Sequence, residues 1–166
     1  MTKSDDIDQI SSMFEAARSL IGGSKIIIAS DGIEENSIVR KPTLPVVVSS
    51  ALAIEIQLKA LLQLNGAARP SGSGHDIFTL FRALPSDLQK SLLEHQVRFT
   101  DFSSEQALSM LEDHRDAFVT WRYPYEKSLL EVAPAFLFGF ALSLSEFLQQ
   151  TVEIERSDNG WLRDDG

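Results

Sequence analysis

The sequence contains no cysteine. This absence excludes disulfide frameworks, zinc-thiolate sites, iron-sulfur clusters and cysteine nucleophiles. Basic charge is scarce as well, because 15 Lys and Arg face 24 Asp and Glu and leave a net charge of -9. Such an acidic chain is not drawn to phosphate backbones or anionic lipid, so we expect no nonspecific nucleic-acid binding. A chain without cysteine also suits a reducing compartment, and we expect a cytoplasmic protein.

Export and membrane signals are also missing. The N-terminal residues are polar and acidic, where a secretory signal carries a basic end followed by an apolar run. The longest apolar stretch, 46–64, is interrupted by polar residues that include Glu55 and Lys59, and a second stretch, 133–144, is too short to cross a bilayer. We therefore expect neither secretion nor a membrane span.

What the sequence does contain is a helical pattern. Apolar residues recur at spacings of three and four from 5 to 21, which predicts an amphipathic helix that ends at Gly22 and Gly23. Over 24–44 this pattern is lost, and the isoleucine-rich stretch 25–30 fits either a short strand or an apolar loop. Pro45 suits the first turn of a central helix that continues to Leu64.

Four further helices are predicted after the central one. Their expected ranges are 75–84, 85–99, 103 to about 124 with a capping box of Ser103 and Gln106, and 134–153. The chain length of 166 residues fits one domain. We therefore expect an all-α fold, an antiparallel up-and-down helical bundle of about five helices with an irregular or short-strand segment at 24–44. Residues 1–156 form the predicted domain, and 157–166 a polar, disordered tail.

Two charged residues interrupt the central helix. Helical phase places Glu55 in the middle of an apolar arc, and Lys59 lies one turn further on the same side. Burying charge is costly unless each group finds a partner. One interpretation is an ordinary ion pair at the edge of the core, and the other is membership of a functional or network-forming polar cluster.

A second concentration of charged and aromatic residues spans 113–126. Arg115 and Arg122 are two turns apart on one helix face, with Glu126 a further turn along. The proline after Tyr123 leaves polar backbone available beside Arg122, a combination typical of a ligand or anion site. The alternative is a proline-kinked helix end in which Arg122 pairs with Glu126 or with the central helix.

His75 and Asp76 follow a glycine-rich loop and begin a predicted helix. Backbone N–H groups and the helix dipole at such a position favour an anion, although a histidine there can also simply bond the loop. His95 and His114 lie on predicted helices without partners at metal-binding spacing. We therefore expect no metal and no cofactor.

Three segments occur in an order that resembles a known family: AIEIQLKALL (53–62), GHDIFTLFRALP (74–85) and FVTWRYPYE (118–126). Together they resemble HEPN-type (higher eukaryote and prokaryote nucleotide-binding) domains over roughly residues 44–150. The resemblance implies a helical bundle, frequent homodimers, and roles in nucleotide binding, RNA cleavage or bacterial conflict. Ribonucleases of the family carry an Arg followed by four to six residues and a His. No histidine follows Arg115 or Arg122 here, and the spacing from Arg69 to His75 crosses a loop.

The sequence thus predicts a noncatalytic HEPN-like binding or regulatory domain, a homodimer whose polar cluster holds an anionic ligand such as a nucleotide. The expected ligand-binding residues are Glu55, Lys59, His75, Asp76, Arg115, Arg122, Tyr123 and Glu126. One alternative is a metal-independent, toxin-like ribonuclease that uses His75 or His114 with one of the two arginines. The other is a dimerisation module whose charge network is purely structural.

Overall fold

The computed structural model describes residues 3–30, 43–68, 70–72, 74–122 and 133–158. These residues contain seven helices and no strand. The helices are α1 (Lys3–Ser30), α2 (Thr43–Leu64), α3 (Ile77–Arg82), α4 (Ser86–Gln96), α5 (Ser104–Asp113), α6 (Ala117–Arg122) and α7 (Pro134–Asp158). The predicted all-α fold is confirmed.

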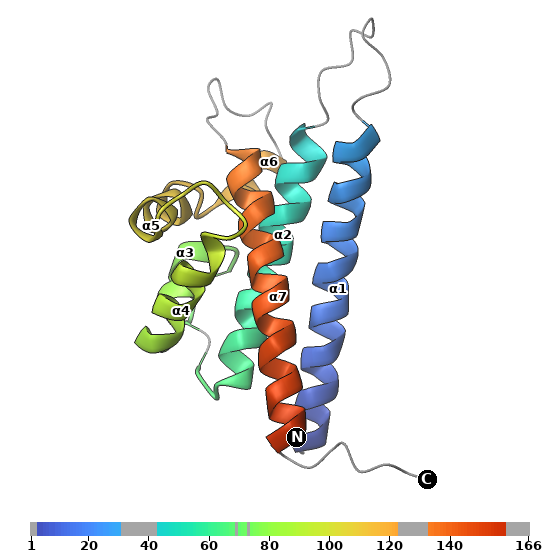
Figure 1. The fold of residues 1–166 in the computed structure, drawn as a ribbon, viewed down its shortest axis with the longest axis vertical. Coiled ribbons are helices and arrows are strands. Elements are labelled where there is room, and N and C mark those ends of the chain that lie inside the picture. The colour runs from blue at the N-terminus through green and yellow to red at the C-terminus, as the bar shows by residue number, and fades with distance from the viewer. Residues whose placement is uncertain (1–2, 31–42, 69, 73, 123–132, 159–166) are drawn as a thin grey trace, which may run out of the picture.

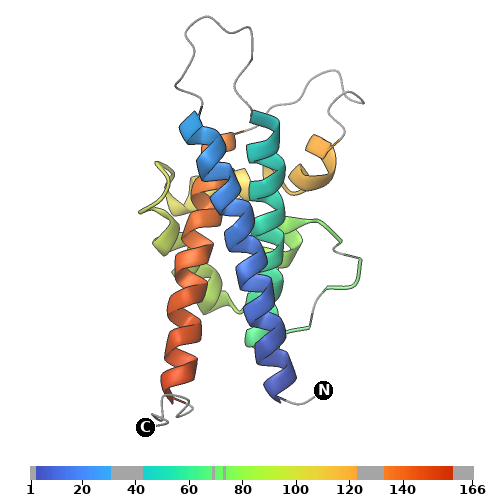
Figure 2. The same ribbon diagram turned by 90° about the vertical axis from the view of Figure 1, so that its right-hand side faces the viewer.

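Three long helices, α1, α2 and α7, lie side by side and form the body of the molecule (Figure 1). The short helices α3, α4 and α5 lie on the side away from α1, as both views show (Figures 1 and 2). Helix α1 runs opposite to the other two long helices, whereas α2 and α7 run in the same direction, because α3 to α6 return the chain to its starting level. The up-and-down order that we expected is therefore not seen between α2 and α7.

Helix α1 does not end at its two glycines, and the strand or loop expected at 25–30 is wrong. The helix continues through Gly22 and Gly23 to Ser30, and a stripe of Ala17, Ile21 and Ser24 is buried against the core. Each glycine costs about 1 kcal/mol in a helix interior. Directly after the glycines, Ser24 is fully buried and its hydroxyl donates to the Leu20 carbonyl over 3.1 Å, a bond that spans both glycines within the helix. Residues 31–42 of the expected irregular segment lie outside the described part of the chain.

The single long helix expected from 103 to about 124 is two helices. Its start is confirmed, because Ser103 and Gln106 form the predicted capping box. The helix is interrupted at His114, whose Nδ1 donates to the Met110 carbonyl over 2.8 Å and whose Nε2 accepts the Ala133 N–H over 3.0 Å. The second bond ties the end of α5 to the start of α7, whereas the first stays within the last turn of α5.

Helix α2 is the most buried element and forms the centre of the core together with aromatic residues such as Phe81, Phe136 and Phe140. The stretch Leu44–Leu64 is long and apolar enough to cross a bilayer by length and composition alone, and 61% of its most apolar window is buried. A core helix of a soluble protein meets the same criterion. Inside this helix lies the charged residue around which the site is built.

Candidate functional site

The Glu55 carboxylate is buried on α2, with a side chain that is only 5% exposed. Its Oε1 accepts from Lys59 Nζ over 2.6 Å, and its Oε2 pairs with His75 Nδ1 over 2.7 Å. Each oxygen of the carboxylate thus has its own partner, which offsets the cost of burying the charge. The pairing also brings together α2 and the segment before α3, so the predicted association of Glu55, Lys59 and His75 is observed.

Both partners of Glu55 remain in contact with solvent. The Lys59 side chain is 23% exposed and the His75 side chain 44% exposed. Because a carboxylate can only accept, Nδ1 of His75 carries the hydrogen of the shared bond. Nε2 is then the nitrogen left for other partners. The His75 ring also packs on the buried Phe118, with ring centroids 4.8 Å apart, so its orientation is fixed from two sides.

A glycine-rich turn delivers His75 to this position. Gly72 and Gly74 have φ angles of +77° and +45°, which side chains with a Cβ adopt only with strain. The Gly74 carbonyl accepts a second bond from Lys59 Nζ over 3.1 Å. Lys59 therefore holds the buried carboxylate and the end of the turn at once, and an ammonium group with three hydrogens keeps one donor for another partner.

Asp76 and Arg115 form a second pair next to His75 in the chain. Asp76 caps α3 by accepting from the Thr79 backbone N–H and hydroxyl, each over 2.8 Å. Arg115 donates to the same carboxylate through Nε over 3.0 Å and through Nη2, and its guanidinium lies 5.8 Å from the Phe78 ring centroid. The Arg115 carbonyl accepts the Ile77 N–H over 3.0 Å, so this pair fixes α3 to the turn between α5 and α6.

The charge state of Asp76 follows from these contacts. Burial by itself would raise the pKa of the carboxyl, but the hydrogen bonds from Thr79 and Arg115 outweigh it and hold the pKa below its ordinary value. The carboxylate also takes the Thr79 N–H at the beginning of α3. That backbone donor, which we expected to be open to an external anion, is therefore occupied by the chain's own side chain.

The remaining predicted residues separate into two groups. Arg122 is the last residue of α6, but its side chain lies outside the described residues, as do Tyr123 and Glu126. Their predicted place in the cluster therefore stays a prediction. His114, which the ribonuclease alternative included, has both ring nitrogens bonded to backbone groups and is 8% exposed. It is a structural residue.

Sequence reasoning missed one contributor. Phe118 is buried, and its ring also supports the exposed His75 ring. Periodicity predicts burial and cannot tell which neighbour a buried ring contacts.

Charged residues of both signs lie at the site. Lys59 and Arg115 compensate Glu55 and Asp76, and a protonated His75 adds a positive charge. Glu112 and Asp116 also act on the Arg115 guanidinium, so Lys59 and His75 are the groups through which the site would attract an anion. Among the described residues, no three His, Asp or Glu side chains lie close enough together to hold a metal ion.

Comparison of the chain with protein-family models, curated proteins and solved structures finds no match.

Proposed function

We propose that this chain is a noncatalytic HEPN-like binding or regulatory domain in which Lys59 and His75 hold an anionic ligand such as a nucleotide. One observation supports this best: a single buried carboxylate, Glu55, orients two nitrogen-bearing side chains that both keep exposed surface. Lys59 has a third N–H available, and Nε2 of His75 becomes a donor when the ring is protonated. Phosphate or carboxylate oxygens would accept from both groups.

The surroundings favour binding over simple ion pairing at the core edge. An ordinary surface pair contributes about 0–1 kcal/mol and fixes nothing beyond its two members. Glu55 is instead buried and ties α2 to a turn that begins the next helix. A site whose donors are already oriented loses less entropy when a ligand binds. Arg115, whose side chain is 44% exposed, and Arg122 remain further contributors to the same proposal.

The proposal also covers the oligomeric state and the cellular compartment of the protein. We infer a cytoplasmic homodimer of the HEPN type from the family resemblance and from the absence of cysteine. Sedimentation equilibrium tests the dimer directly, since a mass of twice the 18.4 kDa chain is expected. A mass of one chain across the micromolar range would contradict it.

A thermal-shift titration with AMP, ATP and inorganic phosphate tests ligand binding. A ligand at about 100 times its Kd raises the free energy of unfolding by about 2.7 kcal/mol, so at least one probe should raise the melting temperature in a saturable way. Lys59→Met and His75→Gln should reduce that response. Lys90→Met is the matched control, because Lys90 is 78% exposed on α4 and away from the site.

Two results would contradict the proposal. The first is a melting temperature that no anion raises, while the site variants still change stability; this favours a purely structural charge network. The second is a ligand response that Lys59→Met and Lys90→Met reduce equally, because nonspecific charge attraction would then explain it.

The second candidate is a metal-independent ribonuclease acting through His75. Its support is the bond from Nδ1 to Glu55, which leaves Nε2 of a neutral ring as a proton acceptor beside the positive charge of Lys59. Incubation with labelled RNA separates the candidates. Cleavage by the wild type that is absent from His75→Ala would replace the binding proposal with the enzymatic one, and a lack of cleavage at equal protein stability supports binding.

A further inference from the structure

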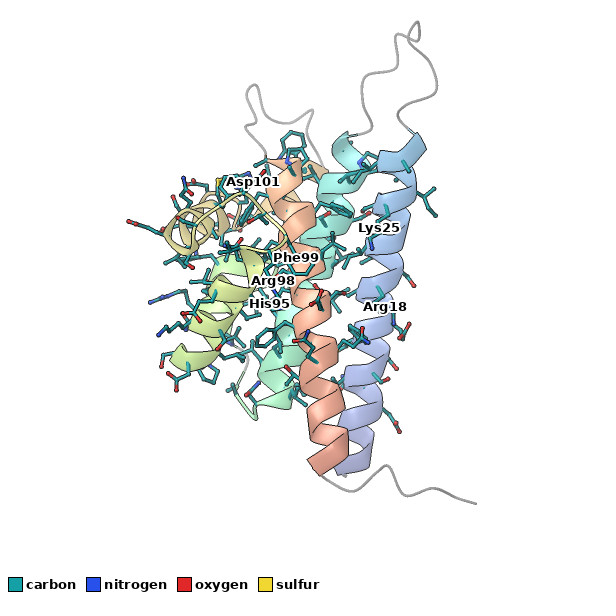
Figure 3. The ribbon with its side chains drawn as sticks, in the orientation of Figure 1. Arg18, Lys25, His95, Arg98, Phe99 and Asp101 are labelled. Carbon is teal, nitrogen blue, oxygen red and sulfur yellow. The ribbon has the colours of Figure 1, made fainter. Side chains whose placement is uncertain are left out.

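A second histidine is enclosed where the C-terminal end of α4 meets α7 (Figure 3). The His95 side chain is only 8% exposed. Its ring stacks on Phe99 with centroids 5.4 Å apart and meets the edge of Phe147 at 5.6 Å. The imidazole is therefore held between two phenyl rings, one from the turn after α4 and one from α7, in surroundings that favour its neutral form.

The two ring nitrogens of His95 have unequal surroundings. Nδ1 bonds the Ser143 hydroxyl over 3.1 Å. Nε2 is shielded from solvent and has no hydrogen-bond partner within the part of the chain that the structure describes. Glu146 Oε1 lies 3.7 Å from Nε2, and the same oxygen lies 3.7 Å from Arg98 Nη2. The carboxylate thus lies near the His95 ring and the Arg98 guanidinium without forming a short bond to either.

The backbone around His95 is packed tightly against α7. A Cβ added to Gly139 would lie 2.6 Å from the Phe99 carbonyl oxygen and 2.8 Å from the Thr100 side chain. Gly139 and Ser143 are one helical turn apart, so the close backbone contact and the His95 hydrogen bond lie along one face of α7. When the end of α4 moves away from this face, both contacts are lost.

We propose that this contact, made by His95, Phe99, Gly139, Ser143 and Phe147, is a pH-sensitive attachment that protonation of His95 releases. A charged imidazole between two phenyl rings loses its hydration, and it regains that hydration when the end of α4 moves away from α7. The proposal does not depend on the anion site around Glu55, because the two share no residue. At acidic pH, release of this contact exposes the Phe99 and Phe147 side chains to solvent.

The charges that face His95 set the direction of the effect. Burial is the main cause that lowers the His95 pKa, Arg98 lowers it further, and Glu146 on α7 opposes both. From the described residues of α4, α5 and α7, Arg98 and Glu146 are the charged groups that act on the ring. The pKa in the closed state lies below the ordinary value of 6.5. The contact is therefore fully stable above 6.5 and is lost as the pH falls through the lowered value.

Hydrogen exchange tests the attachment in the full chain. Protection factors of 86–102, corrected for the intrinsic rate, should fall between pH 7.5 and pH 4.5, by at most about tenfold per pH unit for uptake of one proton. Protection of α2 should change much less. His95→Phe keeps an aromatic ring but cannot titrate, so its 86–102 segment should keep its protection in acid. Glu94→Gln is the control for charge on α4, because Glu94 is 63% exposed, and it should respond like the wild type.

NMR titration of the His95 ring supplies a second measurement if His95→Phe does not fold. Glu146→Gln removes the group that raises the His95 pKa, so the titration midpoint should move to lower pH. Protection of 86–102 that does not change with pH, or that changes equally with α2, would overturn the proposal. So would an unchanged midpoint in Glu146→Gln, or a retained pH response in His95→Phe.

Discussion

Glu55 and His75 are separated by 20 positions in the chain, yet Oε2 of the carboxylate lies 2.7 Å from Nδ1 of the ring. Glu55 is rigidly placed on the most buried helix, and His75 arrives on a turn built from glycines. The bond therefore fixes the orientation of a side chain that lies on a loop. Because the same carboxylate also holds Lys59, the geometry of the whole site depends on Glu55.

Replacing Glu55 with Gln should lower the free energy of unfolding by about 2 kcal/mol, the usual contribution of hydrogen bonds to a charged group. The cost stays below that of breaking a fully buried ion pair, because Lys59 and His75 are partly exposed and recover hydration. Urea unfolding measures the difference. Glu94→Gln, which changes an exposed carboxylate, should shift the same quantity by less than about 0.5 kcal/mol. Equal effects of the two substitutions would show that Glu55 has no special structural role.

Two glycine substitutions should have opposite effects. Gly139→Ala places a Cβ 2.6 Å from the Phe99 carbonyl oxygen and should destabilise the protein by about 1–3 kcal/mol. Gly23→Ala meets nothing within 4 Å in the middle of α1, so it should stabilise by up to about 1 kcal/mol through helix propensity. Thermal and urea unfolding of both variants check the signs. Destabilisation by Gly23→Ala would mean that α1 does not continue through its glycines.

His114 should matter for stability and not for ligand binding. His114→Phe fills similar space but leaves the Ala133 N–H without the imidazole acceptor, at a cost of about 1–3 kcal/mol, whereas the Met110 carbonyl still accepts the backbone N–H of residue 114. The response of the melting temperature to anions should persist, since neither bond reaches the Glu55 site. Loss of the anion response at a temperature where the variant is still folded would place His114 in the site after all.

The Asp76–Arg115 pair should make the free energy of unfolding depend on pH under acidic conditions. The pKa of Asp76 is held below its ordinary value of 3.8, so its contribution is present above 3.8 and is lost as the pH falls through the lowered value. Asp76→Asn keeps a good helix cap but removes the titrating charge. Urea unfolding between pH 5 and pH 2 should show a steeper loss for the wild type than for the variant. If the free energy of unfolding fell equally with pH in the wild type and in Asp76→Asn, the lowered pKa of Asp76 would not be the cause.

Sequence periodicity predicted the parts of this molecule that depend on local pattern. Glu55 was placed inside an apolar arc from helical phase alone, and it is buried. The capping box of Ser103 and Gln106 was predicted from residue types at fixed spacing, and both of its hydrogen bonds are present. In each case the decisive interactions lie within one or two turns of the same helix.

The features of the fold that depend on tertiary contacts could not be predicted from the sequence pattern. Past Gly23, α1 continues with Ser24 buried in the bundle, and His114, at the end of α5, accepts the Ala133 N–H from 19 positions away. His95 appeared to be an ordinary helical residue, since its partner Ser143 lies 48 positions further along. No local spacing rule connects residues that meet only because the chain folds back on itself.

The most direct test of the central claim is a ¹H–¹⁵N titration of the His75 ring with inorganic phosphate and AMP. If Lys59 and His75 hold an anion, the His75 Nε2 resonance should move in a saturable way at constant pH, while His114 stays fixed. In Lys59→Met the same titration should require several-fold more ligand. A His75 resonance that does not respond to either anion, in protein that retains its fold, would contradict the account.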